Sequence, residues 1–278
     1  MVGLSEFLAI HQSDASLLGC LLRRLAGKVS LGTSERAAGV GFFQSDDLLL
    51  RKRPLGGQAA LPEKLAEGVE SEAALICSGA VGQMSRSFNE QMTLPFRFKR
   101  WLFATAGQPE ALNPVRSALL KNLPDYLRRS VKGDSATEAI FFTFLSRLRD
   151  VGRLDDHDLD AATAARSLAA AVGEAERAFE QMGQALPAMA AVVSNGRVMA
   201  ALRRGHPLLV GVVDGLIPCQ KCEIGPAANE LDPKVKSHRM LKAAMLLSTA
   251  DAPLEGFREV ADREVIAIPR TLTEIRSL

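Results

Sequence analysis

The chain has 278 residues, of which 47% are hydrophobic and 24% are charged, and its formal net charge is +2. These values are typical of an ordinary globular protein that is long enough to bury a large core without disulfides or metals. Nucleic-acid-binding domains usually carry a strongly basic face, which a near-neutral charge does not indicate. We therefore expect no nucleic-acid partner.

The sequence also argues against a membrane protein. No stretch reaches the roughly 20 apolar residues that span a bilayer. The segment Met1 to Ile10 lacks a basic region and carries Glu6, so it does not resemble a signal peptide. Cys20 and Cys77 lie in apolar surroundings, where free thiols persist in a reducing compartment. These features predict a cytoplasmic protein without a membrane partner.

The first part of the chain alternates apolar runs with turn signals. The leucines of Ala15 to Leu25 recur every three or four residues and predict a helix. A second, short helix is expected over residues 61–69. Strands are expected in residues 1–10, 39–43, 48–50, 73–77 and 101–105, with a polar turn at 44–47 and a long loop between the last two.

The middle of the chain is helical and the last part returns to strands. Helices are predicted over residues 113–130, 135–151, 158–186 and 235–247, the second with a capping box formed by Ser135 and Glu138. Strands are predicted over residues 190–194, 198–202, 208–213 and 259–268, with Asn195-Gly196 as a hairpin turn. The order of strands, helices and strands favours an α+β fold. No linker divides the chain, so we expect one domain over residues 1–278.

Seven short motifs, spread in order along nearly the whole chain, carry a resemblance to a known family. They are Met1-Val2-Gly3-Leu4, Ala38-Gly39-Val40-Gly41, Gly79-Ala80-Val81-Gly82, Leu94-Pro95-Phe96, Arg100-Trp101-Leu102-Phe103-Ala104, the segment from Gly133 to Phe141, and Ser194-Asn195-Gly196. The chain resembles the glutaminase domain of class II glutamine amidotransferases. It is most similar to the stand-alone bacterial branch that includes a γ-glutamyl hydrolase of ergothioneine synthesis. This resemblance implies a four-layer α/β/β/α sandwich with the N-terminal-nucleophile hydrolase fold.

The chain departs from that family at the nucleophile. The family's reaction uses a cysteine thiolate at the mature N-terminus, with the α-amino group as its base, and the two must lie within hydrogen-bond reach. The corresponding residue is Val2, whose side chain has no nucleophilic atom. None of the four cysteines lies beside the amino terminus, so none replaces it.

The substrate-binding positions implied by the resemblance have changed as well. Cys77 and Ala80 replace the arginine and threonine that hold the glutamine carboxylate, and Ala136 replaces the aspartate that binds its amino group. Ala106 and Gly107 replace the asparagine and glycine of the oxyanion hole, which leaves only a backbone donor. Leu94 and Thr105 occupy the positions of two histidines in the motifs of the family. We expect the region around Leu94, Thr105 and Ala106 to be packed instead of forming a deep polar pocket.

These changes favour a catalytically inactive relative that acts as a binding or regulatory partner of another protein, or of a second copy of itself. The alternative is a hydrolase or amidotransferase that acts on a glutamine-like or γ-glutamyl amide with non-standard residues. A nucleophile with a base within reach in the pocket would favour the hypothesis of an enzyme. A pocket filled by apolar side chains would favour the hypothesis of a binding protein.

Cys219 and Cys222 are separated by two residues, a spacing that suits a zinc knuckle or a redox pair. The other interpretation is that they are two loop cysteines without a shared function. Two thiolates supply half of a tetrahedral zinc shell, so His206, His238 or a second copy of the loop would have to complete it. We expect no other cofactor. We expect both cysteines close together on the surface, on a loop that is absent or shorter in active relatives and that marks the partner or self-association face.

Three further patterns have structural interpretations. The basic run Arg51-Lys52-Arg53 is expected to be a solvated face, and Gly39 with Gly41 to serve turn geometry. The acidic residues 155–158 are expected to begin a helix, where they would complement its dipole.

Overall fold

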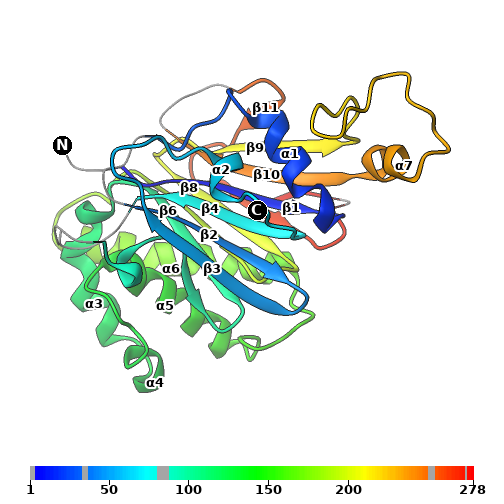
Figure 1. The fold of residues 1–278 in the computed structure, drawn as a ribbon. Coiled ribbons are helices and arrows are strands. Elements are labelled where there is room, and N and C mark those ends of the chain that lie inside the picture. Colours follow the sequence, from blue (N-terminus) through cyan, green and yellow to red (C-terminus); the bar gives the residue numbers. More distant parts are fainter. Residues whose placement is uncertain (1–3, 33–36, 80–87, 250–253, 273) are drawn as a thin grey trace.

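Two antiparallel sheets pack face to face in the computed structural model (Figure 1), which describes residues 4–32, 37–79, 88–249, 254–272 and 274–278. The larger sheet has seven strands in the order β11-β9-β10-β1-β4-β2-β3. Its strands are β1 (Glu6–Gln12), β2 (Ala37–Gln44), β3 (Asp47–Pro54), β4 (Ala73–Ser78), β9 (Leu209–Asp214), β10 (Lys242–Ser248) and β11 (Phe257–Glu259). The smaller sheet has the order β13-β12-β8-β7-β6-β5. Its strands are β5 (Phe96–Phe98), β6 (Trp101–Gly107), β7 (Met189–Ser194), β8 (Met199–Arg204), β12 (Val265–Ile268) and β13 (Arg276–Ser277).

Helices cover the outer faces of both sheets. The long helices α5 (Ala136–Asp150) and α6 (Ala161–Glu180) lie on the six-stranded sheet, and α1 (Leu18–Leu25) and α2 (Pro62–Leu65) lie on the seven-stranded one. The other helical segments are α3 (Arg116–Lys121), α4 (Asp125–Arg128), α7 (Pro233–Met240) and the 3-10 turns η1 (Ala15–Leu17), η2 (Glu90–Met92) and η3 (Pro109–Val115). The predicted α+β, four-layer α/β/β/α sandwich is confirmed. None of the described helices combines the length and apolar character needed to cross a bilayer.

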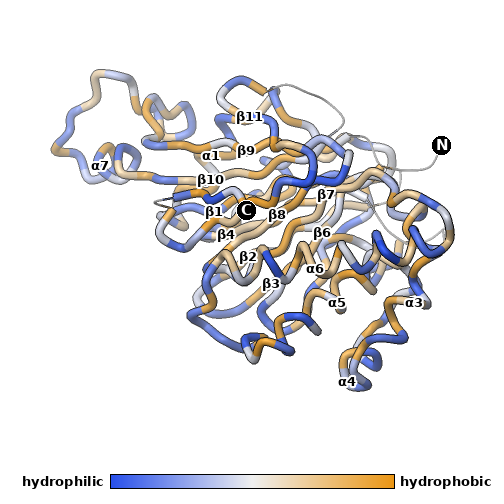
Figure 2. The backbone as a smooth tube through the Cα atoms, turned by 180° about the vertical axis from the view of Figure 1, so that it is seen from behind, coloured by the Kyte–Doolittle hydropathy of each residue, from blue (hydrophilic) through white to orange (hydrophobic). Residues whose placement is uncertain are grey.

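The alternation of side chains along β1 explains why there are two cores. Phe7 and Ala9 point into the cluster between the sheets, whereas Leu8 and Ile10 point into the cluster beneath α1. Successive strand residues face opposite sides, so a strand that is covered on both sides is apolar throughout. Figure 2 shows that the strands inside the molecule are hydrophobic, whereas the α7 segment on its outside is largely hydrophilic.

Aromatic residues join α5 to the six-stranded sheet. The rings of Phe103 and Phe141 stack with centroids 5.2 Å apart, and those of Trp101 and Phe144 meet edge to face at 5.0 Å. Offset-stacked and edge-to-face pairs are the favourable geometries for aromatic rings. They hold the middle of α5 against β6, the strand that carries two of the altered catalytic positions.

Most of the predicted elements are present, including the hairpin at Asn195-Gly196. Asn195 closes that turn because its Oδ1 accepts hydrogen bonds from the backbone N–H groups of Arg197 and Val198. The single helix predicted over residues 113–130 is wrong. It is broken into η3, α3 and α4, and Pro124 stands directly before α4, where a proline cannot donate the hydrogen bond of a continuous helix. The acidic residues 155–158 precede α6 without beginning it, and its N-cap is Asp160.

The C-terminal third differs most from expectation. The helix predicted over residues 235–247 ends at Met240, and residues 242–248 form β10 in the middle of the larger sheet. The strand predicted over residues 259–268 is two strands, β11 and β12, in different sheets. The short strand β5 lies in the segment that was expected to be only a loop.

Gly39 and Gly41 lie within β2, so the predicted turn geometry is wrong. A Cβ atom at Gly39 would lie 2.1 Å from the carbonyl oxygen of Leu94, and one at Gly41 would lie 2.5 Å from Cδ2 of Leu102. Both glycines therefore allow the second sheet and the segment before it to approach the backbone of β2 closely.

Glu138 caps the chain that leads into α5 in a way that the capping box did not predict. Ser135 Oγ accepts from the Glu138 N–H as expected, but the Glu138 carboxylate accepts from the N–H groups of Lys132 and Gly133, at 3.0 and 2.6 Å. Glu138 is only 5% exposed. Its carboxylate therefore fixes the turn that positions Ala136.

We expect Glu138→Ala to lower the free energy of unfolding by about 1–3 kcal/mol, because two partly buried backbone donors lose their acceptors. Glu138→Gln keeps one acceptor oxygen and should lose less. Urea unfolding of the three proteins measures the difference. A Glu138→Ala protein as stable as the wild type would show that water satisfies these donors equally well.

Candidate functional site

Four of the six altered catalytic positions lie in the described residues. Cys77 is in β4, Ala106 and Gly107 end β6, and Ala136 begins α5. The other two, Val2 and Ala80, lie outside the described residues. All four described positions are buried. They belong to the ends of three elements that meet between the sheets.

The backbone donor expected at Gly107 is already in use. The Gly107 N–H donates to the carbonyl oxygen of Ser5 at 3.0 Å, and the Ser5 N–H donates to the carbonyl oxygen of Gly107 at 2.9 Å. Ala106 supplies no side-chain donor. An oxyanion hole requires preorganised donors aimed at the reacting oxygen, and here the Gly107 N–H joins β6 to the residue before β1.

Gly107 has a clear structural reason to be glycine. Its φ of +115° is one that side-chain-bearing residues rarely adopt. A Cβ atom there would also lie 2.5 Å from the carbonyl oxygen of Ala188. The glycine at this position is therefore explained by backbone packing alone.

Cys77 is completely buried, and this burial raises the pKa of its thiol well above the ordinary value. The Lys52 ammonium acts in the opposite direction but does not overcome the burial. A thiol with a raised pKa is a poor nucleophile because the thiolate is the reactive form. Cys77 is thus better described as a core residue than as a substitute nucleophile.

Lys52 is more buried than the predicted solvated face allows. Its Nζ donates to the backbone carbonyl of Glu90 at 2.9 Å, and burial lowers the pKa of its amine to about 8. The Cys77 and Glu138 side chains are close enough to act on it electrostatically. Lys52 therefore contributes a cation at the edge of the altered site.

The remaining positions of the altered site are packed. Leu94 is 0% and Thr105 1% exposed, and the Ala136 N–H donates to Asn113 Oδ1 at 3.0 Å. Thr105 Oγ1 is buried without a hydrogen-bond partner among the described residues. Residues 80–87, which include Ala80, lie outside the described residues, and the expected absence of a deep polar pocket stays a prediction.

A second group of residues forms a compact cluster on the other side of the seven-stranded sheet. One ligand atom each from Cys20, Cys219, Cys222 and His238 lies within 4.8 Å of all the others. The structure brings together the two predicted cysteines and His238. It places His206 elsewhere, with its Nδ1 3.1 Å from Ser248 Oγ. The predicted surface position is wrong for Cys219, which is 4% exposed, and Cys222 is half-buried.

Cys20 was not predicted as a member of this cluster. Cys20 lies among the leucines of the buried face of α1, so its position looked like that of an ordinary core residue. The only signal for it was that a cysteine occurs on a helix face otherwise made of leucine. Its distance of 199 positions from Cys219 left nothing local to detect.

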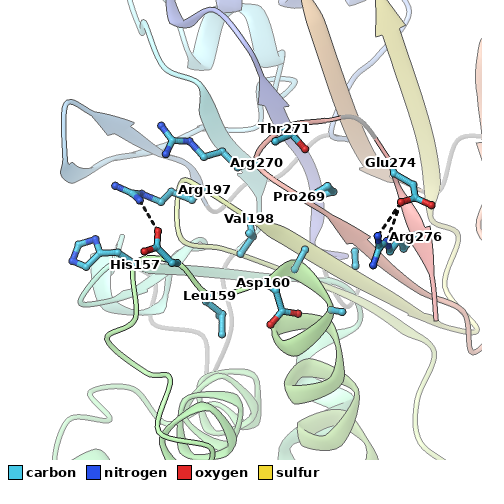
Figure 3. Close-up of a pocket in the computed structure, with 14 residues that line it drawn as sticks. His157, Leu159, Asp160, Arg197, Val198, Pro269, Arg270, Thr271, Glu274 and Arg276 are labelled. Carbon is cyan, nitrogen blue, oxygen red and sulfur yellow. Dashed lines mark hydrogen bonds and ion pairs between the residues drawn. The ribbon is translucent and has the colours of Figure 1, made fainter.

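A third feature is a cavity of about 390 Å³ beside the start of α6 (Figure 3). Its charged groups partly pair with one another, Arg197 with Asp158 at 3.5 Å and Arg276 with Glu274 at 2.9 Å. None of its lining residues is one of the predicted site positions. The cavity is therefore separate from both sites described above.

Comparison with known proteins identifies the architecture. No protein-family model and no curated protein matches the chain. Among solved structures, a glutamine aminotransferase class-II domain protein from Silicibacter pomeroyi is 16% identical, with a TM-score of 0.57 over 98% of each chain. A protein described as a predicted glutamine amidotransferase from Pseudomonas aeruginosa is 15% identical, with a TM-score of 0.50 over 99% of this chain and 96% of that one. The chain has the fold of a class II glutamine amidotransferase domain.

Within this amidotransferase fold, the altered positions lie at the meeting point of β1, β4, β6 and α5. The match extends over nearly the full length of both solved chains. The identities of 15–16% concern the fold, and the chemistry of this chain follows from its own residues.

Proposed function

We propose that this chain is a catalytically inactive protein with the amidotransferase fold, and that it acts by binding a protein partner. The observation that carries the proposal is the use of the Gly107 N–H by the Ser5 carbonyl oxygen, next to Ala106, which has no donor to offer. The identity of Val2 adds the loss of the nucleophile. Removal of one oxyanion donor alone costs about 2.7–4 kcal/mol of transition-state stabilisation.

The described residues do not favour the alternative of an enzyme with non-standard residues. Cys77 is the buried thiol of the altered site, and its raised pKa keeps it protonated at neutral pH. The Lys52 amine, with its pKa near 8, donates its hydrogen bond to a backbone carbonyl. A nucleophile with a base in hydrogen-bond reach is the arrangement that catalysis would need.

We expect no release of ammonia or glutamate from glutamine, because the nucleophile, the oxyanion donors and the substrate clamps are all altered. The same result is expected for Val2→Cys and for the double variant Val2→Cys/Ala106→Asn, since Cys77, Ala80 and Ala136 still provide no substrate contacts. A coupled assay of glutamate formation checks this, with heat-denatured protein as the control. Turnover that scales with protein concentration would refute the proposal of inactivity.

The segment around α7 is the best candidate for the binding face. The two most exposed large hydrophobic side chains of the described residues are Leu231, just before α7, and Met240, at its end, which are 88% and 65% exposed. Exposed apolar side chains on an otherwise polar segment are a common feature of protein-binding surfaces. This location supports the hypothesis that the cysteine-containing loop adjoins the partner face.

The binding proposal can be tested by charge substitution on that face. We expect Leu231→Lys/Met240→Lys to weaken association with a second copy or with another protein, whereas Val151→Lys, at a site that is 57% exposed, should not. Solution mass over a range of protein concentrations measures self-association, and cross-linking with mass spectrometry locates contacts with other proteins. A monomer whose cross-links to other proteins avoid residues 212–240 would contradict the proposed face.

A further inference from the structure

The four side chains of the cysteine–histidine cluster come from three separate parts of the chain. Cys20 lies in α1, Cys219 and Cys222 lie in the loop after β9, and His238 lies in α7. The Sγ atoms of Cys20 and Cys222 are 3.5 Å apart. In a tetrahedral zinc site with Zn–S bonds of about 2.3 Å, two sulfur ligands are roughly 3.8 Å apart. We propose that these residues bind one structural zinc ion per chain, through three thiolates and one imidazole.

His238 is prepared for this role by the hydrogen bond of its other ring nitrogen. Its Nδ1 lies 2.7 Å from the carbonyl oxygen of Lys234, one helical turn earlier, which makes Nδ1 the protonated nitrogen. Metal-binding histidines usually donate their second N–H in this way, because the bond fixes both the tautomer and the ring orientation. His238 Nε2 is buried and has no hydrogen-bond partner among the described residues. Because Nδ1 is engaged with the Lys234 carbonyl, Nε2 is the nitrogen that can coordinate a metal, and a ring nitrogen of His238 lies within 4.8 Å of all three sulfur atoms.

The loop that carries two of the ligands has a closed backbone. The N–H of Cys219 donates to the carbonyl oxygen of Ile224 and the N–H of Ile224 donates to that of Cys219, both at 3.0 Å. This small hairpin holds Cys219 and Cys222 at the two-residue spacing that zinc sites use. The start of the loop is also fixed to α7, because the Leu216 N–H donates to the carbonyl oxygen of His238 at 2.7 Å. The ligands are therefore positioned by backbone hydrogen bonds before any metal binds.

Charge also fits a dication. A bound zinc ion stabilises the thiolate form of the cysteines that coordinate it. Three thiolates and one zinc ion leave a net charge of −1. The Lys221 side chain lies against Gly19 on α1, where a Cβ atom would be 2.3 Å from its Nζ, so a cation is available beside the site.

The donor set also indicates the metal and its role. Soft thiolate ligands with one imidazole favour zinc over calcium, magnesium or manganese, which prefer oxygen ligands. Four protein ligands leave no open position for water or substrate, as in structural zinc sites. The ion would tie the segment between β9 and β10 to α1, on the outer face of the seven-stranded sheet. It would add to the packing that Leu216, Ile224 and Val235 already make in the core beneath α1.

The test is the metal content of the protein. Elemental analysis of protein that is expressed with zinc and purified without chelator should give one zinc per chain, and cobalt substitution should give the intense visible absorption of a tetrahedral thiolate site. Cys20→Ser, Cys222→Ser and His238→Gln should each lose zinc. Cys77→Ser, which changes the remaining cysteine in the other core, should retain it. A chelator should lower the melting temperature of the wild type and of Cys77→Ser but not that of the ligand variants.

Three results would overturn the proposal. They are the absence of zinc and of a cobalt spectrum in folded wild-type protein, a Cys20–Cys222 disulfide in protein isolated under reducing conditions, and half a zinc per chain with chelator-sensitive dimers. The last would show a site shared between two copies. The cobalt spectrum is measured on the wild type, so the test remains valid if a ligand variant fails to fold. The test of the zinc site is independent of the proposed lack of catalysis, because neither the metal content nor the cobalt spectrum involves glutamine.

Discussion

Gly39→Ala is expected to lower the free energy of unfolding by about 3 kcal/mol, since inserting even one methyl group into a close-packed site forces shifts of that cost. The new Cβ would lie 2.1 Å from the Leu94 carbonyl oxygen, and a backbone atom has no rotamer by which to move aside. Gly39 is paired with Lys52 on one side and with Cys77 on the other, so β2 has little freedom to shift. Urea unfolding monitored by circular dichroism provides the measurement.

Two other glycine substitutions serve as controls for Gly39→Ala. Gly41→Ala meets the tip of the Leu102 side chain, which can rotate, so its loss should be smaller. Gly173→Ala lies inside α6 with only an ordinary contact to Arg177, and it should raise stability by up to about 1 kcal/mol through helix propensity. If Gly39→Ala is no less stable than Gly41→Ala, the close approach of Leu94 is not a firm constraint.

We also expect His11 to make the protein less stable in acid. His11 is 1% exposed in the central strand β1, and this burial lowers its pKa to about 4, in spite of a hydrogen bond to the backbone of Arg270. The unfolded chain takes up a proton near pH 6.5, whereas the folded protein does so only near pH 4. The contribution of His11 is therefore fully present above pH 6.5 and is lost as the pH falls toward 4. Its size is about 3 kcal/mol.

Unfolding in urea at pH 7.0 and pH 4.5 tests this pH dependence. Between these two values, His11→Gln should lose about 2–3 kcal/mol less stability than the wild type, because glutamine does not titrate. His157→Gln is the control, because His157 is exposed. All three proteins keep the four cluster ligands, so protonation of those residues affects them equally. An equal pH dependence in wild type and His11→Gln would show that His11 is not responsible.

Local patterns were enough to predict much of the fold. The leucine spacing of α1, the turn between β2 and β3, and the Asn195-Gly196 hairpin each depend on neighbours in sequence, and all are present. The strand β10 was missed because residues 243–247 form a short apolar run. Such a run has the same appearance in a buried strand as in a buried helix, and only its neighbours β9 and β1 decide between them.

The candidate sites show the same limit. Cys219 and Cys222 were recognisable because their spacing is local, whereas Cys20 joins them only through the packing of α1 on the sheet. The use of the Gly107 N–H by Ser5 was also beyond the sequence, because it depends on a contact between residues 102 positions apart. In each case the missing information was long-range geometry and not residue type.

The position of β10 bears on how the protein is made. Phe7 in β1 pairs with Ser248 in β10, so β1 leaves the ribosome well before the partner strand that lies 241 positions later. At synthesis rates of about 5–20 residues per second, this interval lasts roughly 10–50 s. During that time β1 has an unpaired edge, which is open to other nascent chains. We therefore expect this protein to depend on chaperones during translation more than a protein of equal length whose sheets are built from sequential hairpins.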